Sequence, residues 1–525
     1  MPDTRPFELP LSGAQREMWY AQQLDPGNPV FTTADHLDLV GPLDTARLAD
    51  AWRQLVEEAE CLRARFTERD GEPVQTIHPA DGAPLPVHDF TGAPDPDAAS
   101  QERTRTRLAR PASLGADAHG GELHLLGPGR ARLLVHANHI LVDGFSRSLA
   151  YSRLAALYRG AAEAPLPPLR LLTEDEAGYE TSERQATDAA FWEKRFPETP
   201  QPTLLSSALP GTARHTLHRS APLPAETAER LRAQAWQDRV TLPTALIAAT
   251  AGYLSQVTGD TDVLLTMPVT ARTGAAARSV PGMRANFLPL QLSVPPADTR
   301  GALLRQTADG VRATLRHQRY RGDRLRRDLG LIGDAGHSYG PTVNVLDSGA
   351  EFDLGDGCTA LLHNVSTGPV PDLQIVYLDA PGAGWTLRLD AHPDRYTEDE
   401  LTAHLRRLLG YLDQFAQTGT ETPLSRLAAV RPDELAALRE AGRGPAGVDR
   451  FTDVVARVRE LAERTPHALA VDDGTTRLSY AELTARAAAL SHRLAEAGAG
   501  PDTLIALAAP PGTSFVTAIL GILGA

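Results

Sequence analysis

The sequence predicts a mixed α/β (α+β) fold with two lobes and a third, smaller unit. Segments with helical periodicity alternate with segments of strand character along the 525 residues, which is typical of mixed folds. A proline-rich segment at 164–171 and a glycine-rich segment at 442–447 interrupt this alternation and are predicted to be linkers. We therefore expect a first lobe over 1–170, a second lobe over 171–440, a linker over 441–450 and a third unit over 451–525.

The composition excludes several classes of protein. Hydrophobic residues make up 42% and charged residues 22% of the chain, as in ordinary globular domains, and the net charge of −14 argues against nucleic-acid binding. The two cysteines, Cys61 and Cys358, exclude a disulfide scaffold and fit a reducing compartment. The N-terminus lacks a secretory signal, and the longest apolar stretch, 515–525, is shorter than the ~20 residues that cross a bilayer. We expect a cytoplasmic protein without a nucleic-acid or membrane partner.

In the first lobe, apolar spacing and turn residues predict both helices and strands. Leu48, Trp52 and Leu55 recur at helical spacing within 44–66, which predicts one amphipathic helix there. A Gly-Pro-Gly turn at 127–129 joins the two strands of a predicted hairpin. The lobe is expected to contain helices over 11–24, 44–66 and 145–158, strands over 36–40, 122–126 and 132–138, and a loop over 79–97.

The second lobe repeats this mixed character, and the third unit is shorter. Helices are predicted over 225–236, 243–257, 303–318 and 398–415, and strands over 263–267, 288–294, 342–346, 373–378 and 386–391. In the third unit, helices are predicted over 451–462 and 480–495 and strands over 471–472 and 504–508.

The densest polar cluster lies at 136–144, where an apolar strand gives way to a helix. His139 is the natural general base there, because an unperturbed imidazole titrates near pH ~6.5. Asp143 either orients His139 or pairs with an arginine as a structural anion, and Gly144 lets the backbone turn sharply before the helix.

Two other kinds of site are disfavoured by the same residues. His136 and His139 fall on opposite faces of an extended strand, and no third ligand has convincing spacing, so no metal site is expected. The stretch 144–148 lacks the closing glycine of a nucleophile elbow, which argues against a nucleophilic serine. From the residues alone, a structural His139 beside a helix-capping Asp143 remains an open alternative.

Residues 138–144, Asn-His-Ile-Leu-Val-Asp-Gly, resemble the His-His-x-x-x-Asp-Gly signature of the condensation domains of nonribosomal peptide synthetases. Further motifs of that family appear in the expected order over about 6–440, and the last set is most similar to enterobactin-type siderophore synthetases. These motifs lie at 11–20, 61–66, 191–192, 267–272, 286–290, 317–320, 340–345 and 366–373.

Residues 451–525 resemble the beginning of an adenylation domain. The stretch 478–483 is similar to the first core motif of that family, and 519–525 resembles the approach to its second. The phosphate-binding loop of such a domain would lie beyond Ala525, so this unit is not expected to activate an amino acid.

The resemblance implies a fold of two chloramphenicol-acetyltransferase-like lobes in a V-shaped pseudo-dimer, followed by a truncated adenylation fragment. It implies amide formation between a donor acyl or peptidyl thioester and the amine of an acceptor aminoacyl thioester. No cofactor is expected to bind directly, because the 4'-phosphopantetheine arms belong to partner carrier proteins. The implied partners are a donor peptidyl or aryl carrier protein, expected in trans, and a downstream acceptor carrier protein of the same synthetase.

The resemblance also implies roles for individual residues. His139 corresponds to the catalytic histidine of the signature, and Asp143 to an aspartate that pairs with an arginine. Arg272 is the first choice for that arginine and Arg63 the second. The substrate tunnel is expected to involve Asn344 and Ser366.

The chain departs from the signature at Asn138, which replaces the first histidine. Asn138 and Asp143 have the spacing of the two aspartates that define heterocyclisation domains, but the first is an amide and His139 remains. A second alternative is an inactive relative that recruits a tailoring enzyme. Such relatives usually lose the histidine or the aspartate, and this chain has both, which favours the enzyme.

Overall fold

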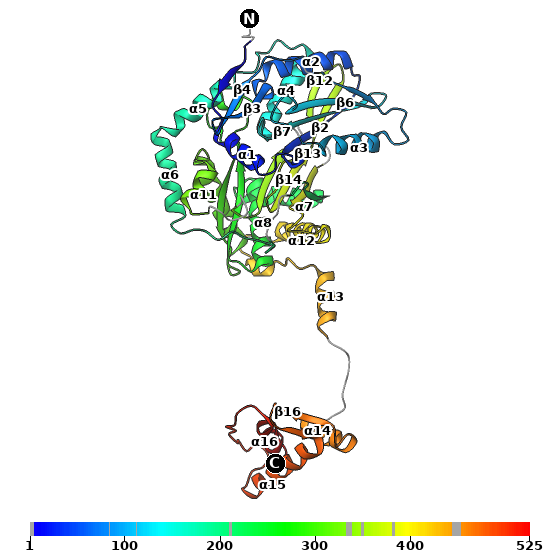
Figure 1. Cartoon of the computed structure of the whole chain (residues 1–525), viewed down its shortest axis with the longest axis vertical. Coiled ribbons are helices and arrows are strands. Elements are labelled where there is room, and N and C mark those ends of the chain that lie inside the picture. Colours follow the sequence, from blue (N-terminus) through cyan, green and yellow to red (C-terminus); the bar gives the residue numbers. More distant parts are fainter. Residues whose placement is uncertain are drawn as a thin grey trace. The chain divides into compact units, whose positions relative to one another are not determined.

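The computed structural model describes residues 5–525, except for 83, 112, 209–212, 332–338, 348–350, 381–383 and 444–452. The chain forms two compact units, Met1–Pro432 and Asp433–Ala525, and each is described by itself. The first unit contains two lobes, each built around a six-stranded sheet (Figure 1).

The sheet of the first lobe has the strand order β12-β13-β2-β7-β6-β5. All neighbours in it are antiparallel except β5 and β6. A smaller sheet, β1-β4-β3, lies in the same lobe. The strands are β1 (Phe7–Leu9), β2 (Thr32–Val40), β3 (Ala64–Arg69), β4 (Glu72–Ile77), β5 (Val87–Asp89), β6 (His119–Gly127), β7 (Arg130–Asn138), β12 (Glu351–Gly355) and β13 (Cys358–Ser366).

The two faces of the main first-lobe sheet are covered differently. Leu37 and Leu133 belong to an apolar core that also includes Trp52 of α2 and Leu154 of α4. The opposite face meets α3 through polar contacts, such as the Ser100 hydroxyl 2.8 Å from Nδ1 of His124. The helices of this lobe are α1 (Gly13–Gln23), η1 (Pro29–Phe31), α2 (Thr45–Glu58), η2 (Glu60–Arg63), α3 (Pro96–Leu108) and α4 (Gly144–Arg159).

The sheet of the second lobe has the strand order β10-β9-β11-β14-β15-β8, with parallel pairing on both sides of β11. Its strands are β8 (Leu217–Pro222), β9 (Asp262–Val269), β10 (Asn286–Ser293), β11 (Thr342–Asp347), β14 (Leu373–Ala380) and β15 (Gly384–Ala391). The remaining helices of the first unit are α5 (Arg170–Glu180), α6 (Glu183–Arg195), α7 (Ala225–Gln237), α8 (Leu242–Thr258), α9 (Ala275–Ser279), α10 (Arg300–Arg316), α11 (Gly322–Asp328), α12 (Glu398–Gln417) and η3 (Leu424–Arg426).

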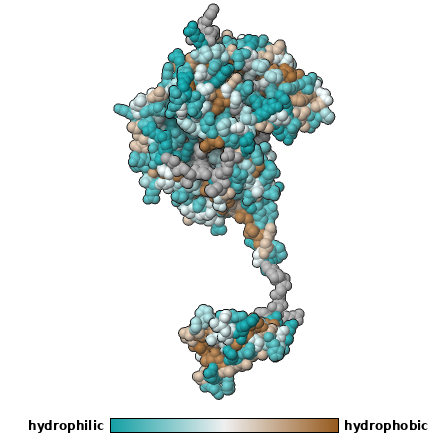
Figure 2. All heavy atoms as spheres, viewed as in Figure 1, coloured by the Kyte–Doolittle hydropathy of each residue, from teal (hydrophilic) through white to brown (hydrophobic). Residues whose placement is uncertain are grey.

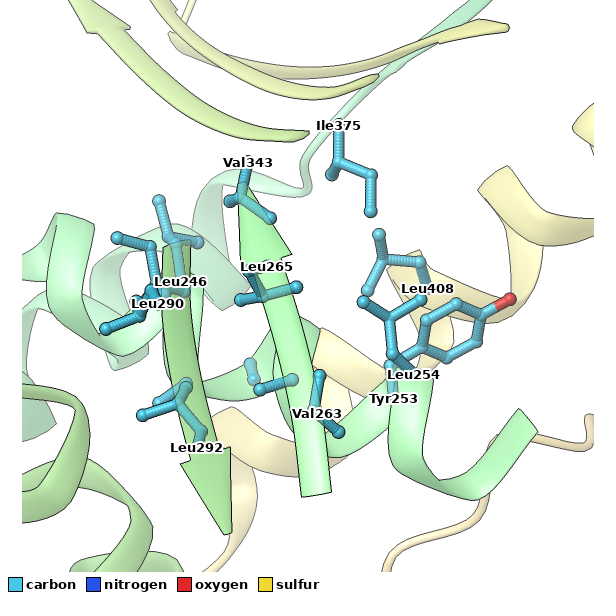
Figure 3. Packing of buried hydrophobic residues seen from close by; sticks show 14 of the residues in the cluster. Leu246, Tyr253, Leu254, Val263, Leu265, Leu290, Leu292, Val343, Ile375 and Leu408 are labelled. Carbon is cyan, nitrogen blue, oxygen red and sulfur yellow. The ribbon is translucent and has the colours of Figure 1, made fainter. Parts of the chain in front are cut away.

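The core of the second lobe forms where α8 and α12 pack against this sheet. Figure 3 shows Leu254 of α8 and Leu408 of α12 close to Val263 of β9. All residues of α8 from Thr244 to Ser255 are buried, so the helix is apolar on every side, as a core helix must be.

Strands β12 and β13 contradict the expected division of the lobes. Residues 351–366 fall within the range 171–440 that was assigned to the second lobe, yet β13 pairs with β2 in the first lobe's sheet. The chain then returns to the second lobe as β14. The tendency of a segment to form a strand is local, but the strand with which it pairs depends on the whole fold. The sequence pattern therefore did not predict that β12 and β13 join the sheet of the first lobe.

Three local expectations are also wrong. The helix predicted over 44–66 ends at Glu58, and the chain continues through η2 into β3. The loop predicted over 79–97 contains β5 and the start of α3. Residues 504–508 are not a strand.

The other predicted helices and strands of the first unit are present, with bounds shifted by a few residues. The hairpin of β6 and β7 turns at 128–129, inside the predicted Gly-Pro-Gly turn. Residues 161–168 have no regular structure, in agreement with a linker, and α5 follows them. Residues 444–450 of the second predicted linker, 441–450, lie outside the described residues, and so do residues 451 and 452.

The second unit is small. It contains α13 (Pro432–Gly442), α14 (Val454–Arg464), β16 (Leu469–Asp472), β17 (Arg477–Ser479), α15 (Tyr480–Glu496) and α16 (Thr513–Leu523). Its core includes Leu478, Leu483 and Leu520. Hydrophobic residues also reach its surface, among them Leu504 and Leu523 (Figure 2).

Within the described residues, no single helix combines the length and the apolar character needed to cross a membrane. The pair α7 and α8 meets that criterion only when the two helices are joined across a bend of 107°.

Candidate active site at the junction of the lobes

The connection between β7 and α4 carries the polar cluster found in the sequence. β7 ends at Asn138 and α4 begins at Gly144, with Asp143 as its N-cap. Oδ1 of Asp143 accepts hydrogen bonds from the main-chain N–H of Ser146 at 2.8 Å and from the Ser146 hydroxyl at 2.7 Å. Asp143 thus satisfies a donor at the start of the helix and fixes where α4 begins.

His139 is held at its main chain and at one ring nitrogen. Its main-chain N–H donates to the carbonyl of Phe31 at 2.8 Å, and its Nδ1 lies 3.0 Å from the carbonyl oxygen of Val142. A carbonyl only accepts, so Nδ1 carries the proton and Nε2 keeps a lone pair. Loss of solvent around the half-buried ring lowers the pKa of His139, and the positive charge of Arg147 lowers it further. The imidazole is therefore neutral near pH 7.

Asp143 is also bound by the second lobe. Its Oδ2 accepts hydrogen bonds from the main-chain N–H groups of Arg284 and Ala285, both at 3.0 Å. Nη1 of Arg272 lies 3.3 Å from the same oxygen, and both side chains are buried. Arg272 also donates to the carbonyl of Gly282 at 2.7 Å. Asp143 therefore joins α4 to the second lobe.

The structure brings Arg272, and not Arg63, to Asp143. Arg63 donates instead to the carbonyl of His78. Asp143 does not orient His139, because Nδ1 of the imidazole is bound to a main-chain carbonyl. Of the two roles considered for Asp143, the geometry matches the structural anion.

Asn138 stabilises the bend that follows β7. Its side chain is buried, donates from Nδ2 to Oε1 of Gln22 at 2.9 Å and accepts at Oδ1 from the N–H of Ile140 at 3.1 Å. Gly144 is an ordinary first residue of α4 and is not among the glycines with positive φ. The sharp turn expected at Gly144 is therefore absent, and Asn138 shapes the bend instead.

The motif at the start of the chain supports the same junction. The hydroxyl of Ser12 donates to the carbonyl of Met283 in the second lobe at 2.9 Å. Nε2 of Gln15 lies 3.3 Å from the carbonyl oxygen of Ile140, one residue after His139. Ser12 and Gln15 thus both contact main-chain carbonyls that lie around the site.

A buried carboxylate near His139 was missed in the sequence. Asp35 of β2 pairs with Arg147 at 2.9 Å, and it also accepts from the hydroxyl of Tyr151 at 2.7 Å and from Nδ2 of Asn364 at 2.9 Å. Arg147 and Tyr151 are four residues apart on one face of α4, which was the available sequence signal. This carboxylate holds the cation that lies near His139.

The two residues expected in a tunnel lie on different strands. Asn344 is half-buried on β11 in the second lobe. The hydroxyl of Ser366, at the end of β13, donates to the carbonyl of Thr32 at 2.8 Å. Two residues further on, Gly368 lies against the ring of His139, a contact that no sequence motif indicates.

Comparison with known proteins identifies the family of the chain. The family model of the condensation domain matches residues 7–438, and that of AMP-binding enzymes matches residues 458–525. The chain belongs to the condensation-domain family of nonribosomal peptide synthetases.

Individual relatives and solved structures are similar to this chain. A dimodular nonribosomal peptide synthase of Bacillus subtilis (strain 168) is 33% identical over 100% of this chain and 22% of its own length. Enterobactin synthase component F of Escherichia coli (strain K12) is 28% identical over 98% of this chain and 40% of its own length. The first condensation domain of the calcium-dependent antibiotic synthetase, solved with a substrate analogue, is 32% identical, with a TM-score of 0.74 over 80% of this chain and 99% of that chain. The chain spans less than half the length of these curated relatives.

These findings confirm the fold predicted for the condensation domain, with its chloramphenicol-acetyltransferase-like lobes. Condensation domains are the amide-forming acyltransferase domains of the synthetases and work with carrier-protein domains. The AMP-binding match agrees with the adenylation fragment expected in the second unit.

His136 lies apart from the site of the condensation domain. Its Nδ1 is 3.3 Å from Nη2 of Arg107 on α3, so it faces the polar side of the sheet. Among the described residues, no group of three or more His, Cys, Asp or Glu side chains is placed to hold a metal ion.

A cleft of about 980 Å³ opens between α1, α5 and α11 of the condensation domain. Arg16 and Tyr20 of α1 are exposed in it. Arg284 lines it too, and its main-chain N–H donates to Asp143, so the cleft extends to the junction of the lobes. The lining contains seven arginines (Arg16, Arg284, Arg319, Arg321, Arg324, Arg326 and Arg327) and five carboxylates (Glu17, Glu176, Glu180, Asp323 and Asp328).

We expect Asp143→Ala to lower the free energy of unfolding by about 3–5 kcal/mol, because it leaves the buried charge of Arg272 without its partner. The matched control is Glu8→Ala, which breaks an exposed ion pair with Arg69 and should leave the melting temperature nearly unchanged. Thermal melting and urea unfolding of both variants check this. Equal melting temperatures for Asp143→Ala and the wild-type chain would contradict the structural assignment.

Proposed function

We propose that this chain forms an amide bond between two thioesters, each carried on the 4'-phosphopantetheine arm of a carrier protein. The donor arm carries an acyl or peptidyl group, and the acceptor arm carries an aminoacyl group with a free amine. The observation that carries this proposal is the neutral imidazole of His139, with its Nε2 lone pair, in the signature of the family at the lobe junction.

The reaction needs alignment and one proton acceptor. The amine nitrogen attacks the thioester carbonyl carbon, the C–N bond forms and the C–S bond breaks. A thioester is already activated, so the main task is to align amine and carbonyl. Nε2 of His139 either takes the proton of the amine, which then passes to the departing thiolate, or holds the amine through a hydrogen bond.

The other residues support this chemistry without reacting. Asp143 and Arg272 hold the start of α4 against the second lobe. We propose that Asn344 lines the path of the substrates. The hydroxyl of Ser366 is bound to the carbonyl of Thr32, which favours an anchoring role over contact with substrate.

A heterocyclisation activity is disfavoured by the position of Asn138. The first aspartate of that signature would stand there, but the buried amide donates to Gln22 and accepts from the main chain. An inactive recruiting domain is disfavoured because His139 and Asp143 are both present in ordered hydrogen bonds.

We infer that one carrier protein delivers its arm through the cleft between α1 and α11. The arm carries a phosphate, and the seven arginines of the lining outnumber its five carboxylates together with Asp175, which pairs with Arg284 and Arg319. The cleft also reaches Arg284, whose main chain binds Asp143 beside the reaction centre.

His139→Ala is expected to fold normally and to lose about 10²–10⁴-fold in condensation rate if the imidazole is a general base. A smaller loss that depends on the acceptor would indicate that it only holds the amine. The measurement is single-turnover condensation with both carrier proteins preloaded. His363→Ala is the control, since His363 lies in the same lobe with an exposed side chain. Full activity of His139→Ala would refute the assignment.

The contribution of His139 to the condensation rate should persist below pH 6.5. The pKa of His139 is lowered from its usual value of about 6.5, so the neutral form that accepts a proton survives to a lower pH. This contribution should then fall as the pH drops through the folded-state pKa. The acceptor amine titrates at about 7.7–8.0 and limits the rate of every variant in the same way, so the wild-type pH–rate profile is divided by that of His139→Ala. An additional acid limb at or above pH 6.5 in this ratio would contradict the lowered pKa of His139.

Charge reversal in the cleft should weaken the use of a carrier protein. Arg16→Glu is expected to raise the KM for one loaded carrier several-fold and to leave kcat unchanged, because a rim charge mainly affects encounter. Arg105→Glu, on the exposed face of α3, is the matched control. Steady-state kinetics with each carrier varied in turn give the answer, and an unchanged KM for both carriers would exclude this entry route.

A further inference from the structure

Residues 367–372, called here the crossover segment, connect β13 of the first lobe to β14 of the second. At its start, the Ser366 hydroxyl donates to the carbonyl of Thr32, and Nδ2 of Asn364 donates to the carbonyl of Ser366 at 3.2 Å. At its end, the buried carboxylate of Asp372 accepts from Arg395 at 3.1 Å and from the hydroxyl of Tyr396 at 3.0 Å. The segment is thus bound to both lobes.

Gly368 lies inside this segment, directly against the imidazole of His139. A Cβ atom at this position would lie 2.6 Å from Cδ2 and 3.5 Å from Nε2 of His139. Its φ of +91° is in the region that favours glycine. Two independent constraints, the backbone angle and the contact with the ring, therefore require glycine.

The imidazole is confined on two sides. Nδ1 is bound to the carbonyl of Val142, and the Cδ2 edge is covered by the main chain of Gly368. The ring cannot swing toward the crossover segment without a clash, so Nε2 keeps one direction. A shift of about 1 Å at a reacting group costs about 10²-fold in rate.

We propose that Gly368 is a positioning residue, whose main chain holds the imidazole of His139 in its reactive orientation. This inference rests on the proposed function of His139 in amide formation. It assigns to the crossover segment a role in the reaction that goes beyond connecting the two lobes.

The test is Gly368→Ala, with Gly71→Ala as the matched control. Gly71 has a similar φ of +83° in the turn between β3 and β4, but a Cβ there meets nothing within 4 Å. Both variants place an alanine at a similar positive φ, and only Gly368→Ala displaces the ring. We expect Gly368→Ala to lose about 10–100-fold in single-turnover condensation, and Gly71→Ala to keep the wild-type rate.

The pH–rate profile separates positioning from a loss of stability. A displaced imidazole gains solvent, so in Gly368→Ala the acid limb that belongs to His139, obtained by dividing the profile by that of the double variant without the ring, should move up toward the ordinary value for histidine. The charged groups that act on His139, Arg147 of α4 and its N-cap Asp143, are unchanged in this variant. A variant that is merely less stable would keep the acid limb of the wild-type chain.

The double variant His139→Ala/Gly368→Ala tests whether Gly368 acts through the ring. It should be no slower than His139→Ala alone, because the group that Gly368 positions is absent. Removal of the ring also removes the clash, so the double variant should regain part of any melting temperature lost in Gly368→Ala. The melting temperature can be measured without an activity assay. It therefore tests the contact between Gly368 and the ring of His139 even if Gly368→Ala folds poorly.

Several outcomes overturn the inference. The first is a Gly368→Ala variant with the wild-type rate and the wild-type acid limb of His139. The second is a double variant in which the rate losses of the two single variants add. The third is a double variant that regains none of the melting temperature lost in Gly368→Ala. A wild-type chain that forms no amide from loaded carriers would overturn the proposed function instead, so the two failures are distinct.

Discussion

The carboxylate of Asp143 accepts hydrogen bonds from both lobes at once. One oxygen binds Ser146 at the start of α4, and the other binds two main-chain N–H groups of the second lobe and lies beside Arg272. A buried carboxylate is tolerated only when its charge and its lone pairs are satisfied, and here that requires both lobes. The position of α4, and of His139 just before it, therefore depends on how the lobes meet.

Around His139, the environment favours a neutral ring with a fixed tautomer. The carbonyl of Val142 fixes the proton on Nδ1, and burial, together with the positive charge of Arg147, lowers the pKa of the ring. Arg147 is itself held by Asp35, which Tyr151 and Asn364 also bind. This network reaches from α4 across β2 to β13, so the hairpin contributed by residues 351–366 supports the surroundings of the histidine.

Local sequence patterns correctly predicted those helices and strands that depend only on neighbouring residues. The amphipathic helix α12 follows from its apolar periodicity, and the hairpin of β6 and β7 follows from its turn residues. Helix α3 was missed because it meets the sheet through Ser100 and Thr104, which leave no apolar stripe. The exchange of β12 and β13 between lobes was missed because strand pairing is a long-range choice that no local pattern records.

Some residues of the site could likewise be found from a local motif, whereas others are brought to it only by the fold. His139 and Asp143 stand four residues apart and could be found from one motif, and Arg272 was chosen by resemblance to the family. Gly368 carries no functional group, and its contact with His139 exists only because the crossover segment returns past the junction. The site is therefore assembled from the first lobe, the second lobe and the segment between them. Neither lobe alone contains the donors that hold Asp143 together with the main chain that confines the imidazole.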